Sequence, residues 1–344
     1  MTPAVKIDNV SIVFGEEPQA ALPLMDQGQG RAEIQKRTGQ VLGVHDCSVD
    51  VAPGEMLVLM GLSGSGKSTL LRAINGLNPV VRGSVTVSDG QWTCNVTHAS
   101  DGDLRQVRRE CVAMVFQQFG LLPWRSVREN VGLGLELAGV GKAERTERVD
   151  RQLGLVGLDG WGDRKVGELS GGMQQRVGLA RAFATDAPIL LMDEPFSALD
   201  PLIRTKLQDE LLELQREMQK TIVFVSHDLD EAFKLGNRIA IMEGGRIVQC
   251  GRPEEIYSDP ADDYVAEFVA HMNPLGVLCA RDVMEPATGA DTDGELAPDV
   301  PVTDVMARLA EGPERLRVVR DGRVLGEVSA TGLVRRLAAP RRGG

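Results

Sequence analysis

The sequence predicts an α/β protein built on a parallel sheet, and three observations lead to that prediction. Short apolar runs alternate with helical patterns along the later part of the chain, which is typical of parallel strands with helices on both faces. One apolar run, Met56–Met60, passes through a glycine-rich loop into a helical pattern over Lys67–Asn75. The chain has 344 residues, 42% hydrophobic and 25% charged, an ordinary globular composition long enough for two domains.

Strands are predicted at the short runs that are rich in apolar residues. These runs are Val5–Phe14, Val41–Val51, Met56–Met60, Ser84–Val87, Cys111–Phe116, Ile189–Met192, Thr221–Val225 and Ile239–Met242. Between the first two strands, the segment Gly15–Gly39 interrupts the pattern as an insertion. Only its second half, from Gly30, is typical of a short helix, and Gly39 closes it.

The clearest helix is predicted over Asp200–Lys220. Asp200 is suited to cap its first turn and Pro201 to occupy that turn. One apolar stripe, predicted to be core, consists of Ile203, Leu207, Leu211, Leu214 and Met218. A second helix is predicted over Met173–Ala184.

A change in composition near Pro274 predicts a domain boundary, with one domain over 1–274 and a tail over 275–344. All ten cationic residues beyond Pro274 are arginine, against 11 acids. The stretch Glu285–Val302 is rich in Pro, Gly, Thr and Asp. The tail is expected to be a small α+β module.

The glycine-rich loop fits the phosphate-binding pattern G-x-x-x-x-G-K-[ST], in the strand–loop–helix context that this pattern needs. Lys67 is expected to reach the β- and γ-phosphates of ATP, and the Ser68 hydroxyl to ligate Mg²⁺. The remaining loop positions expected at the phosphates are Gly61, Leu62, Ser63, Gly64, Ser65, Gly66 and Thr69.

Two carboxylates follow the strand Ile189–Met192. Asp193 is expected to hold Mg²⁺ and Glu194 to act as the base that polarises the attacking water. The alternative is that both are merely solvated acids at a strand end. It is disfavoured because this segment follows the phosphate loop and then the Leu169–Gly172 segment in the expected order. His227 closes the next strand, so we expect it to contact the γ-phosphate and to orient Glu194.

A second anion site is predicted where Ser170, Gly171 and Gly172 begin a helix, because a helix N-terminus attracts negative charge. One chain already carries a complete phosphate loop. The second site is therefore expected to bind the ATP of a partner chain. This predicts a head-to-tail homodimer with two ATP molecules at the interface.

Charge and composition disfavour several other roles. The net charge of −11 argues against a general nucleic-acid-binding role, so no nucleic-acid partner is expected. No apolar run approaches the roughly 18 residues of a membrane span. The first nine residues lack the apolar core of a signal peptide. The five widely spaced cysteines contain no Cys-x-x-Cys pair and suit a reducing compartment better than disulfides or a metal site.

The segment Leu169–Arg176 resembles the signature of the ATP-binding-cassette (ABC) ATPases. From Val5 to about Pro274 the chain resembles the ATPase subunits of bacterial ABC importers, most of all the choline and glycine betaine group, with the choline branch first. The narrower resemblance is carried by Glu33–Gly39, Gly43–Asp46, Met60–Thr69, Asn75–Asn78 and Asp193–Arg204.

This resemblance implies a P-loop NTPase core with an antiparallel β subdomain and a helical signature subdomain. It implies an ATPase that uses ATP and Mg²⁺ to power import of a quaternary amine. Membrane permease subunits and an extracytoplasmic solute-binding protein are the implied partners. The implied location is the cytoplasmic face of the inner membrane. An ABC ATPase for another small solute, or one without a transport role, remains the alternative. A P-loop kinase is disfavoured because it would leave Leu169–Arg176 unexplained. An exporter subunit is disfavoured because many exporters fuse membrane helices to the cassette.

The resemblance also assigns roles to single residues. Val115–Pro123 resembles the glutamine loop of the family, so Gln117 is the implied Mg²⁺ and water ligand, with Gln118 as the alternative. The apolar Phe119–Trp124 is the implied receiving surface for a helix of the membrane subunit, unless it is simply core.

Two further roles follow from the same resemblance. Ser197–Asp200 resembles the loop that communicates across the dimer interface, and Asp200 is counted among the nucleotide-site residues. Phe14 is the implied adenine-stacking residue, although it lies 47 residues before Gly61 because of the insertion, and a buried strand Phe is the alternative.

The tail resembles a regulatory module of the cystathionine-β-synthase type. The matching pieces are Ala280–Met284, Pro301–Leu309, Arg315–Gly322 and Val324–Ser329, about one motif where such modules pair two. Either the two chains of a dimer supply the pair, or the tail is a remnant without a sensing role.

Overall fold

The computed structural model describes residues 2–270, 274–287 and 294–338, and they fall into two compact units. The first unit comprises residues 1–227 and 240–247, and the second comprises 228–239 and 248–344. All the residues that the sequence singles out for nucleotide chemistry belong to the first unit. Within the described ranges, no helix combines the length and the apolar character that a membrane span needs.

A six-stranded sheet forms the centre of the fold, with the order β10-β9-β3-β8-β7-β6. Its strands are β3 (Met56–Met60), β6 (Val112–Val115), β7 (Ile189–Asp193), β8 (Thr221–Val225), β9 (Arg238–Glu243) and β10 (Arg246–Gly251). The pairs β3–β8, β8–β7 and β7–β6 are parallel. Every residue of β3, β7 and β8 is buried, which explains why these strands are continuous apolar runs. The predicted parallel sheet is confirmed.

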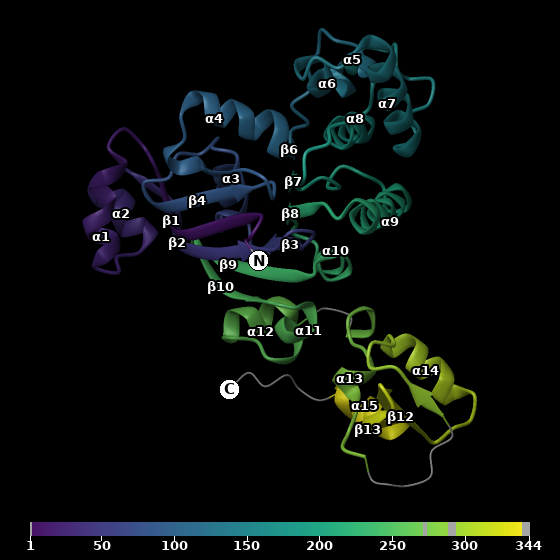
Figure 1. Ribbon diagram of the computed structural model, residues 1–344. Coiled ribbons are helices and arrows are strands. Elements are labelled where there is room, and N and C mark those ends of the chain that lie inside the picture. The colour runs from purple at the N-terminus through teal and green to yellow at the C-terminus, as the bar shows by residue number, and fades with distance from the viewer. Residues whose placement is uncertain (1, 271–273, 288–293, 339–344) are drawn as a thin grey trace. The chain divides into compact units, whose positions relative to one another are not determined.

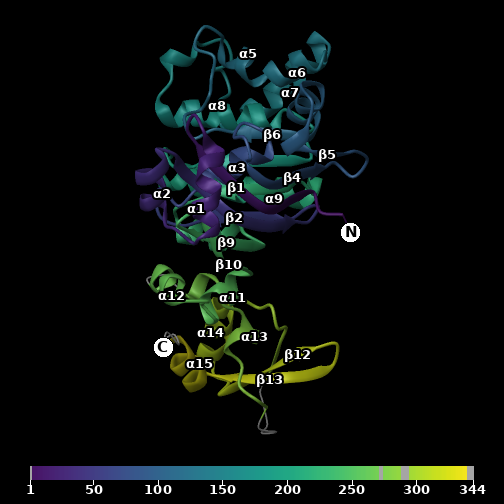
Figure 2. The same ribbon diagram turned by 90° about the vertical axis from the view of Figure 1, so that its left-hand side faces the viewer.

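An antiparallel sheet supplies the second layer of the first unit. Its order is β2-β1-β4-β5, formed by β1 (Val5–Phe14), β2 (Val41–Val51), β4 (Arg82–Ser88) and β5 (Thr93–Asn95). In both ribbon views, α1 (Leu22–Asp26) and α2 (Arg31–Thr38) lie beside β1 and β2 (Figures 1 and 2). Residues 15–39 therefore form a small helical cap on the edge of this sheet.

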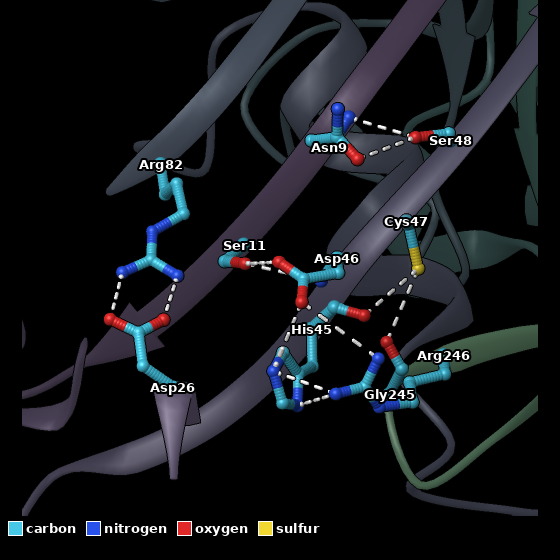
Figure 3. Close-up of polar contacts among 10 residues, drawn as sticks. All are labelled: Asn9, Ser11, Asp26, His45, Asp46, Cys47, Ser48, Arg82, Gly245 and Arg246. Atoms are coloured by element: carbon cyan, nitrogen blue, oxygen red, sulfur yellow. Dashed lines mark hydrogen bonds and ion pairs between the residues drawn. The ribbon is translucent and has the colours of Figure 1, made fainter. Parts of the chain in front are cut away.

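The insertion is a packed element rather than a loose loop. Buried side chains from both sides of it form one apolar cluster, namely Val13, Ala21, Leu24, Met25, Ile34 and Leu42. The carboxylate of Asp26 on α1 pairs with both terminal nitrogens of Arg82 on β4, at 2.5 and 3.0 Å (Figure 3). The predicted helix after Gly30 corresponds to α2, and Gly39 ends it with a left-handed φ of 71°. The prediction missed α1 and the 3-10 turn Pro18–Ala21.

The remaining helices of the first unit are α3 (Lys67–Ile74), α4 (Asp101–Gln106), α5 (Val127–Val131), α6 (Leu133–Leu137), α7 (Lys142–Leu155), α8 (Gly171–Phe183) and α9 (Pro201–Met218). Figures 1 and 2 show α5, α6 and α7 gathered with α8 at the end of the unit farthest from α1 and α2. This group is the helical subdomain implied by the resemblance, and α8 carries the signature segment.

Two details of the predicted elements were wrong. The predicted strand Cys111–Phe116 is shorter, because Cys111 ends a π-helical turn over Val107–Cys111 and the strand closes at Val115. The predicted core stripe of α9 is buried only at Leu207 and Leu211, whereas Met218 is 51% exposed in the last turn. Ile203 and Leu214 are half-buried, so the stripe reaches the core only in the middle of the helix.

The second unit contains α10 (Leu229–Leu235), α11 (Pro253–Ser258) and α12 (Asp263–Val269), followed by a small α+β module. The module consists of α13 (Ala280–Val283), β11 (Glu295–Leu296), α14 (Val302–Ala310), β12 (Arg315–Arg320), β13 (Arg323–Ser329) and α15 (Ala330–Ala338). Its own apolar cluster includes Leu278, Val302, Val318 and Leu333, and Tyr257 of α11 packs against it.

Candidate nucleotide site

One pocket of about 690 Å³ gathers most of the residues that the sequence predicts for nucleotide chemistry. Its walls come from β1, β2, α2, the phosphate loop, and the loops after β6, β7 and β8. The lining residues are Phe14, Arg31, Gln35, Val41, Leu42, Gly43, Ser63, Gly64, Gly66, Lys67, Ser68, Thr69, Gln117, Glu194 and His227. The fold thus brings together segments that are far apart in the sequence.

The phosphate loop joins β3 to α3, and two of its glycines have no room for a side chain. A Cβ on Gly61 would lie 2.1 Å from the Met242 carbonyl oxygen, and one on Gly66 would lie 2.7 Å from the Gly43 carbonyl oxygen. Both glycines also have positive φ, 140° and 105°. The loop therefore curls tightly between β2 and β9, with its backbone facing the pocket.

Lys67 begins α3 and is only 6% exposed. Its ammonium donates to the carbonyl oxygens of Gly61, at 2.8 Å, and Leu62, at 3.0 Å. Burial lowers the pKa of the Lys67 ammonium, while Glu194 and Asp193 oppose that shift. The side chain is held at the phosphate loop as a positive charge with two acids nearby.

Asp193 ends β7 and is completely buried. Its carboxylate accepts a hydrogen bond of 2.6 Å from the Ser68 hydroxyl and pairs with Arg72 at 2.9 Å. Arg72 lies one turn after Ser68 on α3, so both side chains reach the same carboxylate. A hydroxyl and a carboxylate oxygen at this spacing are hard donors of the kind that Mg²⁺ prefers.

The carboxylate of Glu194 contacts two other predicted site residues, Gln117 and His227. Its Oε2 accepts from the Gln117 amide at 2.9 Å and lies 3.5 Å from His227 Nδ1. Gln118, the alternative to Gln117, is not among the residues that line the pocket. Because β7 and β8 are neighbours, with Asp193 paired to Val225, the two loops that carry Glu194 and His227 meet at one sheet edge.

The backbone of Glu194 is in the left-handed region, with φ of 48°, and side chains around it hold it there. Its amide donates to the Val225 carbonyl at 3.1 Å, and its carbonyl accepts from Gln175 at 3.1 Å and from the Ser197 hydroxyl at 3.0 Å. Gln175 is 1% exposed, and its amide oxygen also accepts from Ala198 N. The signature helix α8 is thereby tied directly to the backbone of the predicted base.

Eight predicted residues do not line this pocket. Four of them, Gly61, Leu62, Ser65 and Asp193, belong to the phosphate loop or the end of β7 beside it, and the other four lie on α8 and at the start of α9. The Ser170 hydroxyl caps α8 by accepting from Met173 N at 3.4 Å, and Gly171 and Gly172 form the first turn. Asp200 caps α9 by accepting from Ile203 N at 3.1 Å, as predicted for its structural role. Within one chain, none of the four lines the pocket that contains Lys67.

Phe14 ends β1 opposite Val41 and lines the pocket wall. It is 38% exposed, so the alternative of a buried strand side chain is wrong. Gly43 makes room for it, because a Cβ there would lie 2.8 Å from the Phe14 ring. The insertion separates Phe14 from the phosphate loop in sequence. The pairing of β1 with β2 nevertheless places Phe14 in the pocket that the phosphate loop lines.

Sequence reasoning missed Arg31, Gln35, Arg72 and Gln175. Arg72 and Gln175 had a visible signal, since Arg72 lies one turn after Ser68 on a predicted helix and Gln175 lies inside the Leu169–Arg176 segment. Arg31 and Gln35 had none, because they reach the pocket only through the packing of the insertion on β2.

Comparison with known proteins identifies the family. The family model for ABC transporters matches residues 44–197. The glycine betaine/proline betaine transport system ATP-binding protein ProV of Escherichia coli (strain K12) is 50% identical over 279 residues, which cover 81% of this chain and 69% of that protein. The trimethylamine N-oxide transport system ATP-binding protein TmoW of Ruegeria pomeroyi is 43% identical and covers 96% of both chains.

Among solved structures, a dimeric ATP-binding cassette in a post-hydrolysis state, bound to ADP and phosphate, matches with a TM-score of 0.62 at 31% identity. The match covers 72% of this chain and 98% of that cassette. The predicted fold class and the predicted ATPase activity are confirmed. The chain belongs to the ABC transporter family and is one of its ATP-binding, ATP-hydrolysing subunits.

Proposed function

We propose that Lys67 binds the β- and γ-phosphates of ATP and that Glu194 is the general base for the attacking water. The observation that carries this proposal is the contact of Glu194 with both Gln117 and His227 in the pocket that Lys67 lines. The loop backbone and Lys67 neutralise phosphate charge. Glu194 accepts the proton of the water, and His227 and Gln117 orient the carboxylate and the water.

The residues around Asp193 fit a magnesium ion by the chemistry of their donors. Ser68, Asp193 and Gln117 would hold Mg²⁺, with Asp193 acting through water. The ion would neutralise the charge that develops on the phosphates. Arg72, which pairs with the second oxygen of Asp193, fixes the orientation of this buried carboxylate.

We further propose that two chains form a head-to-tail homodimer in which Ser170, Gly171 and Gly172 of one chain bind the ATP held by Lys67 of the other. Capping leaves the first backbone amides of α8 available for an anion. Asp200 and the Ser197–Asp200 loop would carry contacts across this interface. In a single chain, none of these three residues lines the pocket, which supports this arrangement.

The transported solute is proposed to be a quaternary or fully methylated amine. The sequence resemblance favours choline, whereas the names of the relatives carry glycine betaine, proline betaine and trimethylamine N-oxide, so glycine betaine is our first choice. The subunit would act at the cytoplasmic face of the inner membrane, bound to permease subunits through the Phe119–Trp124 surface. An extracytoplasmic binding protein would deliver the solute.

Uptake measured in vesicles tests the proposed cargo. The chain is reconstituted in vesicles with permease subunits and a binding protein of the proposed transporter, and ATP is enclosed with the chain. We expect ATP-dependent uptake of labelled glycine betaine, competed by unlabelled choline or trimethylamine N-oxide and not by spermidine. ATP-dependent uptake of an unrelated solute, with none of glycine betaine, would contradict the cargo assignment and leave the ATPase assignment intact.

Residues 275–344 are proposed to form a regulatory tail of the cystathionine-β-synthase type that follows a nucleotide-binding domain over 1–274. The module has its own apolar cluster, which supports a distinct tail, whereas Tyr257 packs against that cluster and Arg281 pairs with Glu254 at 2.9 Å, so α11 adjoins the tail within one compact unit. Truncation after Asn273 tests the role of the tail; Asn273 lies outside the described residues. The truncation removes no residue proposed to bind the nucleotide. We therefore expect basal ATPase activity to survive and the salt dependence of transport to change. Superimposable salt curves, with and without the tail, would make it a remnant.

A further inference from the structure

The side chain of Arg31 links three segments that surround the phosphate loop. It extends from the first turn of α2, inside the insertion, and its Nη1 donates to the Gly64 carbonyl at 2.7 Å. Its Nη2 donates to the Gly43 carbonyl of β2. A Cβ on Gly245 would lie 2.5 Å from the same Nη2, so this glycine leaves room for the guanidinium.

The other side of the phosphate loop is held by the turn between β9 and β10, which contains Gly245. The Gly245 amide donates to the Ser65 carbonyl at 3.1 Å, and the Gly245 carbonyl accepts from His45 N at 2.8 Å. The Gly245 carbonyl also accepts from the Cys47 thiol at 3.2 Å (Figure 3). The phosphate loop is thus fixed by the β9–β10 turn at Ser65 and by the insertion at Gly64.

The charge of Arg31 is not neutralised by a neighbouring acid. In the described ranges, burial and the Cys47 thiol, and no carboxylate, act on the guanidinium of Arg31, and its Nε has no acceptor. Burial lowers the pKa of the guanidinium, yet arginine stays charged at neutral pH. Arg31 therefore adds a positive charge to the wall of the pocket that Lys67 and Ser68 also line.

We propose that Arg31 is a positioning residue of the nucleotide site, through which the inserted helices hold the phosphate loop and raise its affinity for the charged phosphates of ATP. The inference rests on the proposed placement of the ATP phosphates at Lys67. It gives the insertion a role in nucleotide binding. Ile34 of α2 packs in one apolar cluster with α1 and with Leu42 of β2, and the Asp26–Arg82 pair ties α1 to β4, so the helix that carries Arg31 is anchored on the antiparallel sheet.

Binding of ATP, ADP and AMP to the purified full-length chain tests this inference, with isothermal titration calorimetry as the readout. We expect Arg31→Gln to weaken ATP binding about tenfold, the loss of one charged hydrogen-bonding group near the ligand. The loss should become smaller from ATP to ADP to AMP, because the lost charge acts on the phosphates. Arg31→Lys keeps the charge but not both carbonyl contacts. Its ATP affinity should therefore lie between those of the wild type and Arg31→Gln, and its loss of affinity should again decrease from ATP to ADP to AMP.

Arg37→Gln is the matched control, since Arg37 lies on the exposed face of the same helix. Its ATP affinity should equal that of the wild type. Thermal unfolding without nucleotide establishes that each variant is folded. Equal ATP affinity in the wild type and Arg31→Gln, or an equal loss for ATP, ADP and AMP in both Arg31 variants, would overturn the proposal. Either result would leave ATP binding by the wild type, and thus the proposed function, unaffected.

Discussion

Glu194→Gln is expected to lower the rate of ATP hydrolysis by about 10²–10⁴-fold, the usual contribution of a general base, while ATP still binds. Glutamine has the shape of glutamate but cannot accept the proton of the attacking water. The contacts to Gln117 and His227 and the backbone held by Gln175 do not depend on the carboxylate charge alone. The measurement is phosphate release by the assembled transporter at saturating ATP, together with ATP affinity.

Glu217→Gln provides the control, because it makes the same chemical change on the exposed part of α9. It should hydrolyse ATP at the wild-type rate. If Glu194→Gln also hydrolyses ATP at that rate, Glu194 is not the base. If it fails to bind ATP, its role is in binding and not in proton transfer.

Lys67→Ala and Ser170→Arg are each expected to abolish ATPase activity when every chain carries the change, and dimers that combine one chain of each kind are expected to recover part of that activity. Lys67→Ala removes the charge at the phosphates, and Ser170→Arg places a bulky side chain at the start of α8. In a head-to-tail dimer, one site of the mixed pair combines Lys67 of one chain with Ser170 of the other and is intact. Both changes fall in the second site.

Mixed dimers are isolated with two different affinity tags, and their ATPase activity is compared with that of each single-variant dimer. Recovery toward half of the wild-type activity is expected from one intact site, if the two sites work independently. Mixed dimers that form but show no recovered activity would count against the shared-site arrangement.

The strands were predictable because their burial leaves a direct trace in the sequence. β1, β2, β3 and β8 begin and end where the apolar runs do, since all or alternate side chains face the core. Helix α7 was missed because only Val149 and Leu153 are buried along its 14 residues, which is too weak a periodic signal. Helix α1 has five residues and owes its stability to packing in the insertion, which no local pattern displays.

The candidate site was predictable where motif and position coincide. The phosphate loop, Glu194 and His227 follow buried strands, so sheet topology alone brings them together. Arg31 was not predictable, because its two carbonyl partners are 12 and 33 residues away and become neighbours only when the insertion folds onto β2. An arginine in the first turn of a short helix has no sequence feature that distinguishes it from a solvated one.

The mass and nucleotide content of the full-length Glu194→Gln chain in MgATP test the central claim most directly, with light scattering after size exclusion as the measurement. The account predicts a particle of twice the mass of one chain that contains two ATP molecules, and a return to single chains when MgATP is removed. ATP bound to single chains at every protein concentration, with no dimer, would contradict the claim that two chains share two ATP molecules at their interface.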